Sequence, residues 1–335
     1  MIKLAIDMGT SITKIYRADT NSGIVLAEPS CVAVSADGEI KAIGKEAKNL
    51  MGKTAEYTSI IYPAYEGEIV DMRLCVEMLK TFLERVGFKP SSFRRSQVLF
   101  SVPCGISSRS FARYKDLAEE CGLKKAFFVE QPYLSAIGAG VSLIDSDPVF
   151  CLDIGGGVSN AAVLSSDGII AGISMNIGGN NMDANIVSRI AKNNKLHIGA
   201  LTAEKLKNEI DSLASTALGT MVAEGSSVET CQPASTSVQA SDITECIRVY
   251  VDKILEYVAA VLWKLPAEVA ATVNRNGVFL PGGVMKIPYL PQYVGRALKM
   301  QVHVCEEPQF ATALGGGTLF TDKQFLYKFS KKIDD

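Results

Sequence analysis

The alternation of apolar and polar positions divides the chain into short strands and longer amphipathic helices. Apolar runs of strand length are found at 98–103, 126–129 and 149–153. Apolar residues recur at helical spacing over 71–86, 107–121 and 132–140. Strands that alternate with helices are typical of a sheet whose strands are joined by helical crossovers. The pattern therefore predicts the α/β class.

The second half of the chain continues this pattern with less regular spacing. Thr202 is the predicted N-cap of a helix over 203–210. The segment 223–240 is rich in serine and threonine, but its alternation predicts a short exposed sheet. A long helix is predicted from Ser241 to just before Pro266, and the chain closes with a polar, lysine-rich tail.

Two stretches repeat one plan: an apolar strand that ends in aspartate, a glycine-containing turn, and a returning strand. The first runs from Leu4 to Tyr16 with Asp7 at the turn, and the second from Val149 to Leu164 with Asp153. Glycines let backbone N–H groups approach a phosphate, and an aspartate at a strand end suits the accompanying Mg²⁺. One such turn is as often structural as functional. The pair predicts two related halves that hold one nucleotide between them.

Composition narrows the class further. The 335 residues are 47% apolar and 21% charged, with a formal net charge of −2, which is ordinary for a globular chain and gives no electrostatic affinity for nucleic acid. The eight cysteines are scattered and there are two histidines, so reduced thiols are favoured over a disulfide or zinc framework. No apolar run reaches the roughly 18 residues of a membrane span, and we expect a cytoplasmic protein.

The stretch 87–95 combines two phenylalanines with basic residues. Phe88 and Phe93 flank lysine, proline and serine, and two arginines follow. Aromatic rings beside cations suit a membrane interface. The alternative is that both rings fold back onto the domain.

Together these motifs resemble the actin-like ATPase superfamily, which includes DnaK-class chaperones and sugar kinases, and within it the MreB family of bacterial rod-shape filament proteins. The similarity runs almost from end to end. Its motifs are Asp7–Thr10, Glu28-Pro29-Ser30, Glu46-Ala47-Lys48, Gly52-Lys53-Thr54, Val102–Gly105, Ala136–Gly140, Asp153–Gly157, Ile177-Gly178-Gly179, Ala203–Lys207, Pro281-Gly282-Gly283 and the glycine triplet at Gly315.

The resemblance implies an actin-like ATPase fold: two duplicated, RNase H-like α/β domains around a nucleotide cleft, each with a smaller subdomain. Domain I would comprise 1–142 and 308–335, with its small subdomain at about 33–70. Domain II would comprise 143–307, with its small subdomain at about 180–242.

The resemblance also implies a site for ATP and Mg²⁺. Gly9, Thr10 and Ser11 would surround the β-phosphate, with Lys14 as a phosphate contact, and Gly155, Gly156, Gly157 and Val158 would surround the γ-phosphate. Asp7 and Asp153 would hold the hydrated Mg²⁺ and, with Gln131, form the catalytic set. The adenosine contacts would be Glu204, Lys207, Gly178, Gly179, Gly282 and Gly283.

Three departures from the family pattern bear on the chemistry. Gln131 stands where most MreB-like relatives carry the glutamate that orients the attacking water, and glutamine cannot take a proton as a general base. Val158 replaces a threonine beside the γ-phosphate. Pro281 and Val284 replace a threonine and a glycine near the adenosine. The glutamine implies a slow, weak Mg²⁺-dependent ATPase, and the changes at Pro281 and Val284 bear on nucleotide selectivity and affinity.

By resemblance, the protein would polymerise into filaments at the inner face of the cell membrane and help determine cell shape by guiding wall synthesis. Its partners would be further copies of itself, inner-membrane lipid through Phe88 and Phe93, and membrane proteins of the MreC, MreD and RodZ type. The alternatives are a chaperone-like nucleotide switch, a sugar kinase, and a divergent paralogue that co-assembles with another MreB.

Overall fold

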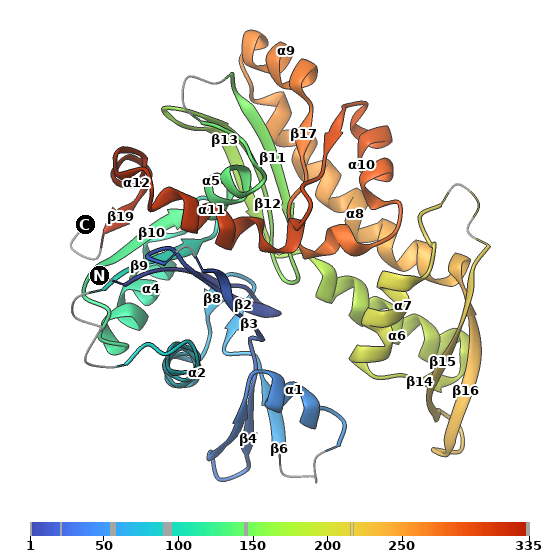
Figure 1. Cartoon of the computed structure of the whole chain (residues 1–335). Helices are drawn as coiled ribbons and strands as arrows, with labels where there is room; N and C mark the ends of the chain where they lie inside the picture. The colour runs from blue at the N-terminus through green and yellow to red at the C-terminus, as the bar shows by residue number, and fades with distance from the viewer. Residues whose placement is uncertain are drawn as a thin grey trace.

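The computed structural model describes residues 2–20, 22–53, 58–89, 96–143, 147–214, 216 and 218–332. Over these residues the chain forms two large mixed sheets, and two smaller lobes of strands and helices lie at the lower end of the view in Figure 1. The layers are those of an α/β fold, as the strand and helix pattern predicts.

The first large sheet has the strand order β19-β10-β9-β1-β2-β3. Its strands are β1 (Lys3–Met8), β2 (Ile12–Arg17), β3 (Gly23–Pro29), β9 (Gln97–Val102), β10 (Ala126–Glu130) and β19 (Lys331–Lys332). β1, β2 and β3 form an antiparallel meander, whereas β1, β9 and β10 run parallel. Its helices are α2 (Met72–Arg85), α4 (Ser108–Glu120) and α5 (Gln131–Gly138).

The second large sheet repeats this plan with the order β13-β12-β11-β17-β18. Its strands are β11 (Val149–Ile154), β12 (Ser159–Ser165), β13 (Gly168–Met175), β17 (Val278–Phe279) and β18 (Val302–His303). Again a meander, β11 to β13, is followed by two strands parallel to its first strand. The duplication predicted from the two hairpins is therefore present in the topology, while the exact domain boundaries stay predictions.

Each small lobe is built on a three-stranded sheet. In the first lobe β4 (Val32–Ser35), β5 (Ile40–Ile43) and β6 (Thr58–Ile61) pack with α1 (Lys45–Leu50), and the short β7 (Ala64–Tyr65) and β8 (Glu68–Ile69) follow. The second lobe holds β14 (Leu196–His197), β15 (Thr220–Ser227) and β16 (Pro233–Gln239), with α6 (Gly179–Asn194) and α7 (Ala200–Glu209). β15 and β16 form the exposed sheet predicted for 223–240.

The remaining helices are α8 (Ala240–Trp263), α9 (Ala267–Asn276), η1 (Gly283–Lys286), α10 (Leu290–Leu298), η2 (Pro308–Phe310), α11 (Ala311–Leu319) and α12 (Lys323–Phe329). Of these, α8 to α10 accompany the second sheet, and α11 and α12 pack on the side of the first (Figure 1). Although α8 is long, no helix among the described residues has the length and apolar character needed to cross a membrane.

Helices α5 and α11 lie against each other between the two large sheets (Figure 1). A side-chain carbon on Gly138 would overlap the carbonyl of Ala311, and one on Gly315 would overlap the carbonyl of Leu134. A core cluster that contains Leu134 and Leu319 joins Leu99 of the first sheet to Leu164 of the second. Glycine at the crossing therefore lets two backbones touch, and that contact fixes how the halves face each other.

Two expectations for local structure need correction. Thr202 is not an N-cap, because α7 begins at Ala200 and the extended backbone of Gly199 caps it, so Thr202 lies inside the helix. The lysine-rich tail contains α12, capped by the Asp322 carboxylate, and β19, which pairs with β10.

The membrane-loop prediction is wrong for Phe88. Its ring is only 2% exposed and packs in the core cluster with Phe82 and Leu83 of α2. The chain leaves α2 through a turn at Gly87 in which the Phe88 N–H donates to the Leu83 carbonyl at 2.9 Å, and this turn directs the ring inward. Phe93 lies outside the described residues.

Replacing Gly315 with alanine tests the glycine contact between α5 and α11. Alanine favours an isolated helix by about 1 kcal/mol over glycine, but here its methyl group would enter the Leu134 carbonyl. We expect Gly315→Ala to lower the free energy of unfolding by about 3 kcal/mol, as measured by urea denaturation. Gly199→Ala, where an added carbon meets nothing within 4 Å, is the control. A Gly315→Ala protein as stable as the control would show that the backbones can separate.

Candidate nucleotide site

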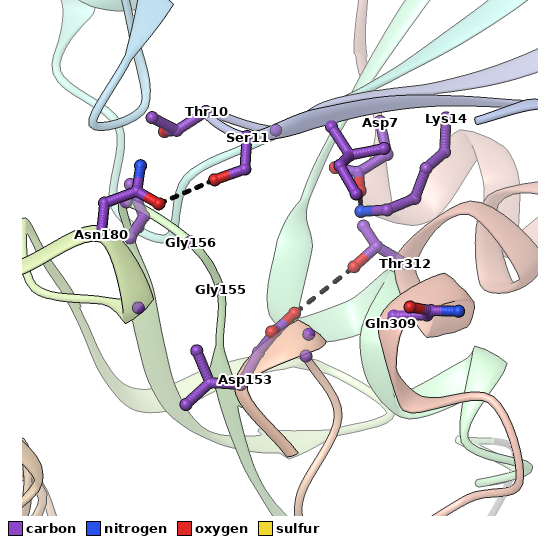
Figure 2. A pocket seen from close by; sticks show the side chains of 18 of the residues that line it. Asp7, Thr10, Ser11, Lys14, Asp153, Gly155, Gly156, Asn180, Gln309 and Thr312 are labelled. Carbon is purple, nitrogen blue, oxygen red and sulfur yellow. Dashed lines mark hydrogen bonds and ion pairs between the residues drawn. The ribbon is translucent and has the colours of Figure 1, made fainter. Parts of the chain in front are cut away.

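The turns of the two aspartate hairpins line one cavity between the halves of the molecule (Figure 2). The cavity takes in nearly all the residues predicted to bind nucleotide: Asp7, Gly9, Thr10, Ser11, Lys14, Gln131, Asp153, Gly155, Gly156, Gly157, Val158, Gly179, Glu204, Lys207, Gly282 and Gly283. Of the predicted set, Gly178 lies just behind the lining, where a side chain would overlap the backbone of Gly155 and Gly156.

The two hairpin turns touch each other across the cavity. The Ser11 hydroxyl donates to Oδ1 of Asn180 at 2.9 Å, which links the first turn to the helix beside the second (Figure 2). A side chain on Gly156 would overlap Ser11, and one on Gly157 would come within 2.5 Å of the Thr10 hydroxyl. Only glycine permits this approach, and it leaves backbone at the cavity wall, as phosphate binding requires.

Asp7 is held at the end of β1 by groups from three elements. Its carboxylate forms an ion pair with Lys14 at 2.8 Å and accepts from the Ser101 hydroxyl at 2.7 Å. Nε2 of Gln131 lies 3.5 Å from the Oδ1 atom that accepts from Ser101. Lys14 lies opposite Asp7 in the register of β1 and β2, so the hairpin itself sets this pair.

Asp153 is more deeply enclosed at the end of β11. Oδ2 accepts from the Ser135 hydroxyl at 2.5 Å and from the Thr312 hydroxyl at 3.3 Å (Figure 2). Burial raises the pKa of Asp153, and the like charge of Asp7 raises it further, against the opposing effect of the Ser135 hydrogen bond. Asp7 and Asp153 line the same cavity, and a cation held by both carboxylates would offset that repulsion.

The donor set fits a magnesium ion that arrives with phosphate. Among the described residues there is no group of three or more histidine, cysteine, aspartate or glutamate side chains placed to hold a metal. Two carboxylates are what Mg²⁺ usually takes from a protein, since phosphate oxygens and water complete its six ligands. Asp7 and Asp153 would be those carboxylates.

The far end of the cavity is lined by α7. Lys207 is 5% exposed and forms an ion pair with Asp183 at 2.8 Å, while also donating to the Gly179 carbonyl at 3.2 Å. Glu204 instead pairs at 3.2 Å with Lys48 of α1, in the other small lobe. Glu204 and Lys207 thus line the same cavity, as predicted, but they pair with Lys48 and Asp183 and not with each other.

Helix α6 is joined directly to the second hairpin. The Gly179 N–H donates to the Gly155 carbonyl at 3.0 Å, and the Asn180 N–H donates to the Gly156 carbonyl at 2.7 Å. Gly282, at φ +104°, brings the chain after β17 against Asp153 and Ile154. Close backbone contacts explain glycine at Gly178 and Gly282, whereas a side chain at Gly179 would crowd the side chains of Lys207 and Val284.

Several polar residues that line the cavity were not predicted from the sequence. The cavity lining also includes Asn160, Asn180, Asp183, Asn208, Lys286, Gln309 and Thr312. Asn160 carried a usable signal, because it is a polar residue directly before the apolar run 161–164 of the predicted returning strand, and in the structure it is 2% exposed. Thr312 has no such signal, since its role depends on where α11 meets β11.

Comparison with known proteins identifies the family. The family model described as MreB/Mbl protein matches residues 1–327. The chain belongs to the MreB/Mbl family. This MreB/Mbl chain is 31% identical over 327 residues to the cell shape-determining protein Mbl of Bacillus subtilis, covering 97% of both chains. It is 31% identical over 322 residues to the cell shape-determining protein MreB of Escherichia coli, covering 94% of this chain and 92% of the relative.

Solved structures agree with the family assignment. MreB5 of Spiroplasma citri bound to AMPPNP matches with a TM-score of 0.89 at 26% identity, covering 96% of each chain. The MamK double helical filament matches with a TM-score of 0.79 at 20% identity, covering 96% of this chain and 99% of that one, and supports the fold alone. The MreB/Mbl chain thus has the actin-like fold that its motifs predict.

Replacing Asp153 with asparagine tests the cost of the buried charge. The pKa of Asp153 in the folded protein is raised above its ordinary value of 3.8. At pH values between the ordinary pKa and the raised pKa, the folded protein binds more protons than the unfolded chain, so the free energy of unfolding falls as the pH rises. We expect nucleotide-free Asp153→Asn to melt a few degrees above wild type at about pH 8, with the difference shrinking towards about pH 4.

Calorimetry at several pH values measures this effect. Asp116→Asn, at an exposed position of α4, is the matched control and should melt like wild type throughout. An Asp153→Asn protein that melts below wild type at high pH would show that the hydrogen bonds to Asp153 outweigh its burial.

Proposed function

We propose that the protein binds ATP with Mg²⁺ in this cavity, hydrolyses it slowly, and polymerises head to tail into filaments that help determine cell shape. The carrying observation is that the aspartate-ended hairpins of both halves face one cavity and touch there, Gly156 against Ser11 and Gly157 against Thr10. The Spiroplasma citri relative is described in complex with AMPPNP and with ADP.

The residues divide the work of binding by position. The backbone of Gly9–Ser11 and of Gly155–Gly157 would surround the phosphates, with Lys14 supplying a positive charge beside Asp7. Glu204, Lys207, Gly282 and Gly283 would contact the adenosine. Mg²⁺ between Asp7 and Asp153 would neutralise phosphate charge and orient the terminal phosphate.

Hydrolysis would depend on positioning more than on proton transfer. Gln131 reaches the cavity from the start of α5, and its amide can orient a water molecule without removing a proton. Val158 supplies no hydroxyl at the turn. Positioning and charge neutralisation alone give a slow rate of ATP hydrolysis. A slow rate suits an ATPase in which hydrolysis determines when subunits leave the filament.

Filaments would form because a head-to-tail contact repeats without closing on itself. ATP that contacts both halves would favour one relative position of the lobes, and loss of the terminal phosphate would release it. We place the filaments in the cytoplasm along the inner face of the membrane, with wall-synthesis membrane proteins of the MreC, MreD and RodZ type as partners. Membership of a family of cell shape-determining proteins favours this function over a chaperone switch, a sugar kinase or an accessory paralogue.

Electron microscopy of the purified protein tests nucleotide-dependent assembly. We expect filaments with Mg²⁺ and ATP, and none with Asp153→Ala, because the variant loses one of the two carboxylates for the cation. Asp116→Ala, which changes an exposed aspartate of α4, should still polymerise. Filaments of Asp153→Ala that match wild type in length and number would refute the proposed role of this carboxylate.

Flotation with vesicles of anionic lipid tests membrane association. Since Phe88 belongs to the core, Phe88→Ser would destabilise the fold and cannot report on lipid binding. We expect Phe93→Ser to lower vesicle binding while sparing filament formation. Tyr327→Ser, at a half-exposed aromatic of α12, is the control for general loss of surface apolar area. Unchanged flotation of Phe93→Ser would remove this residue from the membrane contact.

A further inference from the structure

One buried amide joins the two halves of the molecule at the place where hydrolysis is proposed. Asn160 lies on β12 of the second sheet and is 2% exposed. Its Nδ2 donates to Oε1 of Gln131 at 2.7 Å, and its Oδ1 accepts from the Cys104 N–H at 3.1 Å. Cys104 follows β9 and Gln131 begins α5, so both of these partners accompany the first sheet.

We propose that Asn160 is a positioning residue that sets the orientation of the Gln131 amide for water attack on the terminal phosphate. This inference rests on the proposed ATPase function. It adds a second amide to the site, from the half of the molecule opposite to Gln131.

The hydrogen bonds run from the Cys104 N–H through Asn160 and Gln131 to Asp7, and the two end groups fix the direction of each bond. A backbone N–H can only donate, so Asn160 must present its oxygen to Cys104 and its NH₂ to Gln131. Gln131 must then present its oxygen to Asn160, which turns its NH₂ towards the Asp7 carboxylate, 3.5 Å away. A carboxylate can only accept, so both ends of the network require the same orientation.

This orientation leaves the chemistry that water positioning needs. A glutamine oxygen has two lone pairs, and Asn160 uses one, so the second can accept from a water molecule in the cavity. If the Gln131 amide were reversed, its oxygen would face the Asp7 carboxylate and its NH₂ would face the NH₂ of Asn160. Both contacts would be repulsive, so Asn160 excludes the reversed amide.

The network also makes the orientation depend on the position of the two halves. Asn160 lies on β12, which pairs with β11, the strand that carries Asp153. Gln131 directly follows β10, which belongs to the same sheet as Asp7. The 2.7 Å bond spans the two halves, so the α5–α11 contact that fixes how the halves face each other also helps to keep the Gln131 amide in place.

A double-mutant cycle with single-turnover ATP hydrolysis tests the proposal. We expect Asn160→Ala to lower the hydrolysis rate about tenfold while changing the Kd for ATP by less than about twofold, since it misplaces a water and touches no phosphate. In the Gln131→Ala background the same change should have almost no effect. Asn185→Ala, which removes an amide on α6 that donates to the Cys246 carbonyl, is the matched control.

Asn160→Asp is a second variant that keeps the side-chain shape. Its carboxylate can no longer donate to the Gln131 oxygen and would repel it, and it would also add a negative charge to the cavity that contains Asp7. Asn160→Asp should therefore lower the hydrolysis rate at least as far as Asn160→Ala. An equal loss from Asn160→Ala with and without Gln131 would overturn the proposal, because Asn160 would then act through something else. Failure of the wild type to bind ATP would instead overturn the proposed function.

A measurement without nucleotide decides the geometry independently. The side-chain NH₂ signals of Gln131 are identified by their loss in Gln131→Glu. In ¹H–¹⁵N spectra of the wild type, the two protons of this NH₂ should have well-separated chemical shifts, and these shifts should change in Asn160→Ala. Asn185→Ala should leave them in place. Gln131 signals that are the same with and without the Asn160 amide would refute the link, whatever the hydrolysis rate.

Discussion

The structure depends on holding two aspartates at the ends of two buried strands so that they face each other. Asp7 and Asp153 are 4% and 7% exposed, and burial and mutual repulsion both oppose the charge of Asp153. Without a cation this arrangement costs stability. The Lys14 ammonium, which pairs with Asp7, and the hydroxyls of Ser101, Ser135 and Thr312 offset part of that cost. A cation held by both carboxylates would offset more of it.

That arrangement needs the two sheets to meet at a fixed distance, and glycine provides it. In the triplet of α11, Gly315 meets the backbone of α5, Gly316 meets Ala5 of β1, and Gly317 meets the Tyr16 ring. One helix thereby packs without side chains against the other central helix and against the strand that carries Asp7. A larger residue at any of these positions would move the first hairpin relative to the second. The glycines far from the cavity therefore serve the same geometry as those within it.

The sequence predicts this molecule best where chemistry and backbone geometry coincide. The paired hairpins, their aspartates and the glycines after β17 could be read from the chain because each needs a special residue at a fixed place in a repeated pattern. The role of Thr312 could not, and Asn160 could be singled out only as a polar residue beside an apolar run, since a buried polar residue acquires its role from neighbours that are distant in sequence. Phe88 shows the same limit for apolar residues: its loop is rich in basic groups, yet one turn after α2 directs the ring into the core. Helix α9 was not predicted, although Val269 and Val273 lie four residues apart on its core-facing side.

The small lobes are joined across the cavity opening far more weakly than the sheets beneath them. The ion pair between Lys48 and Glu204 links α1 to α7, but these side chains are 31% and 46% exposed. Exposed pairs contribute about 0–1 kcal/mol, which cannot hold two lobes together against thermal motion. The glycine contacts between α5 and α11, by contrast, allow little sliding. Motion should therefore concentrate in the lobes, and a ligand that reaches both the hairpins and Glu204 would supply the closure that the protein lacks. Glu204 would then exchange Lys48 for the ligand, so binding itself would alter the only described ion pair between the lobes.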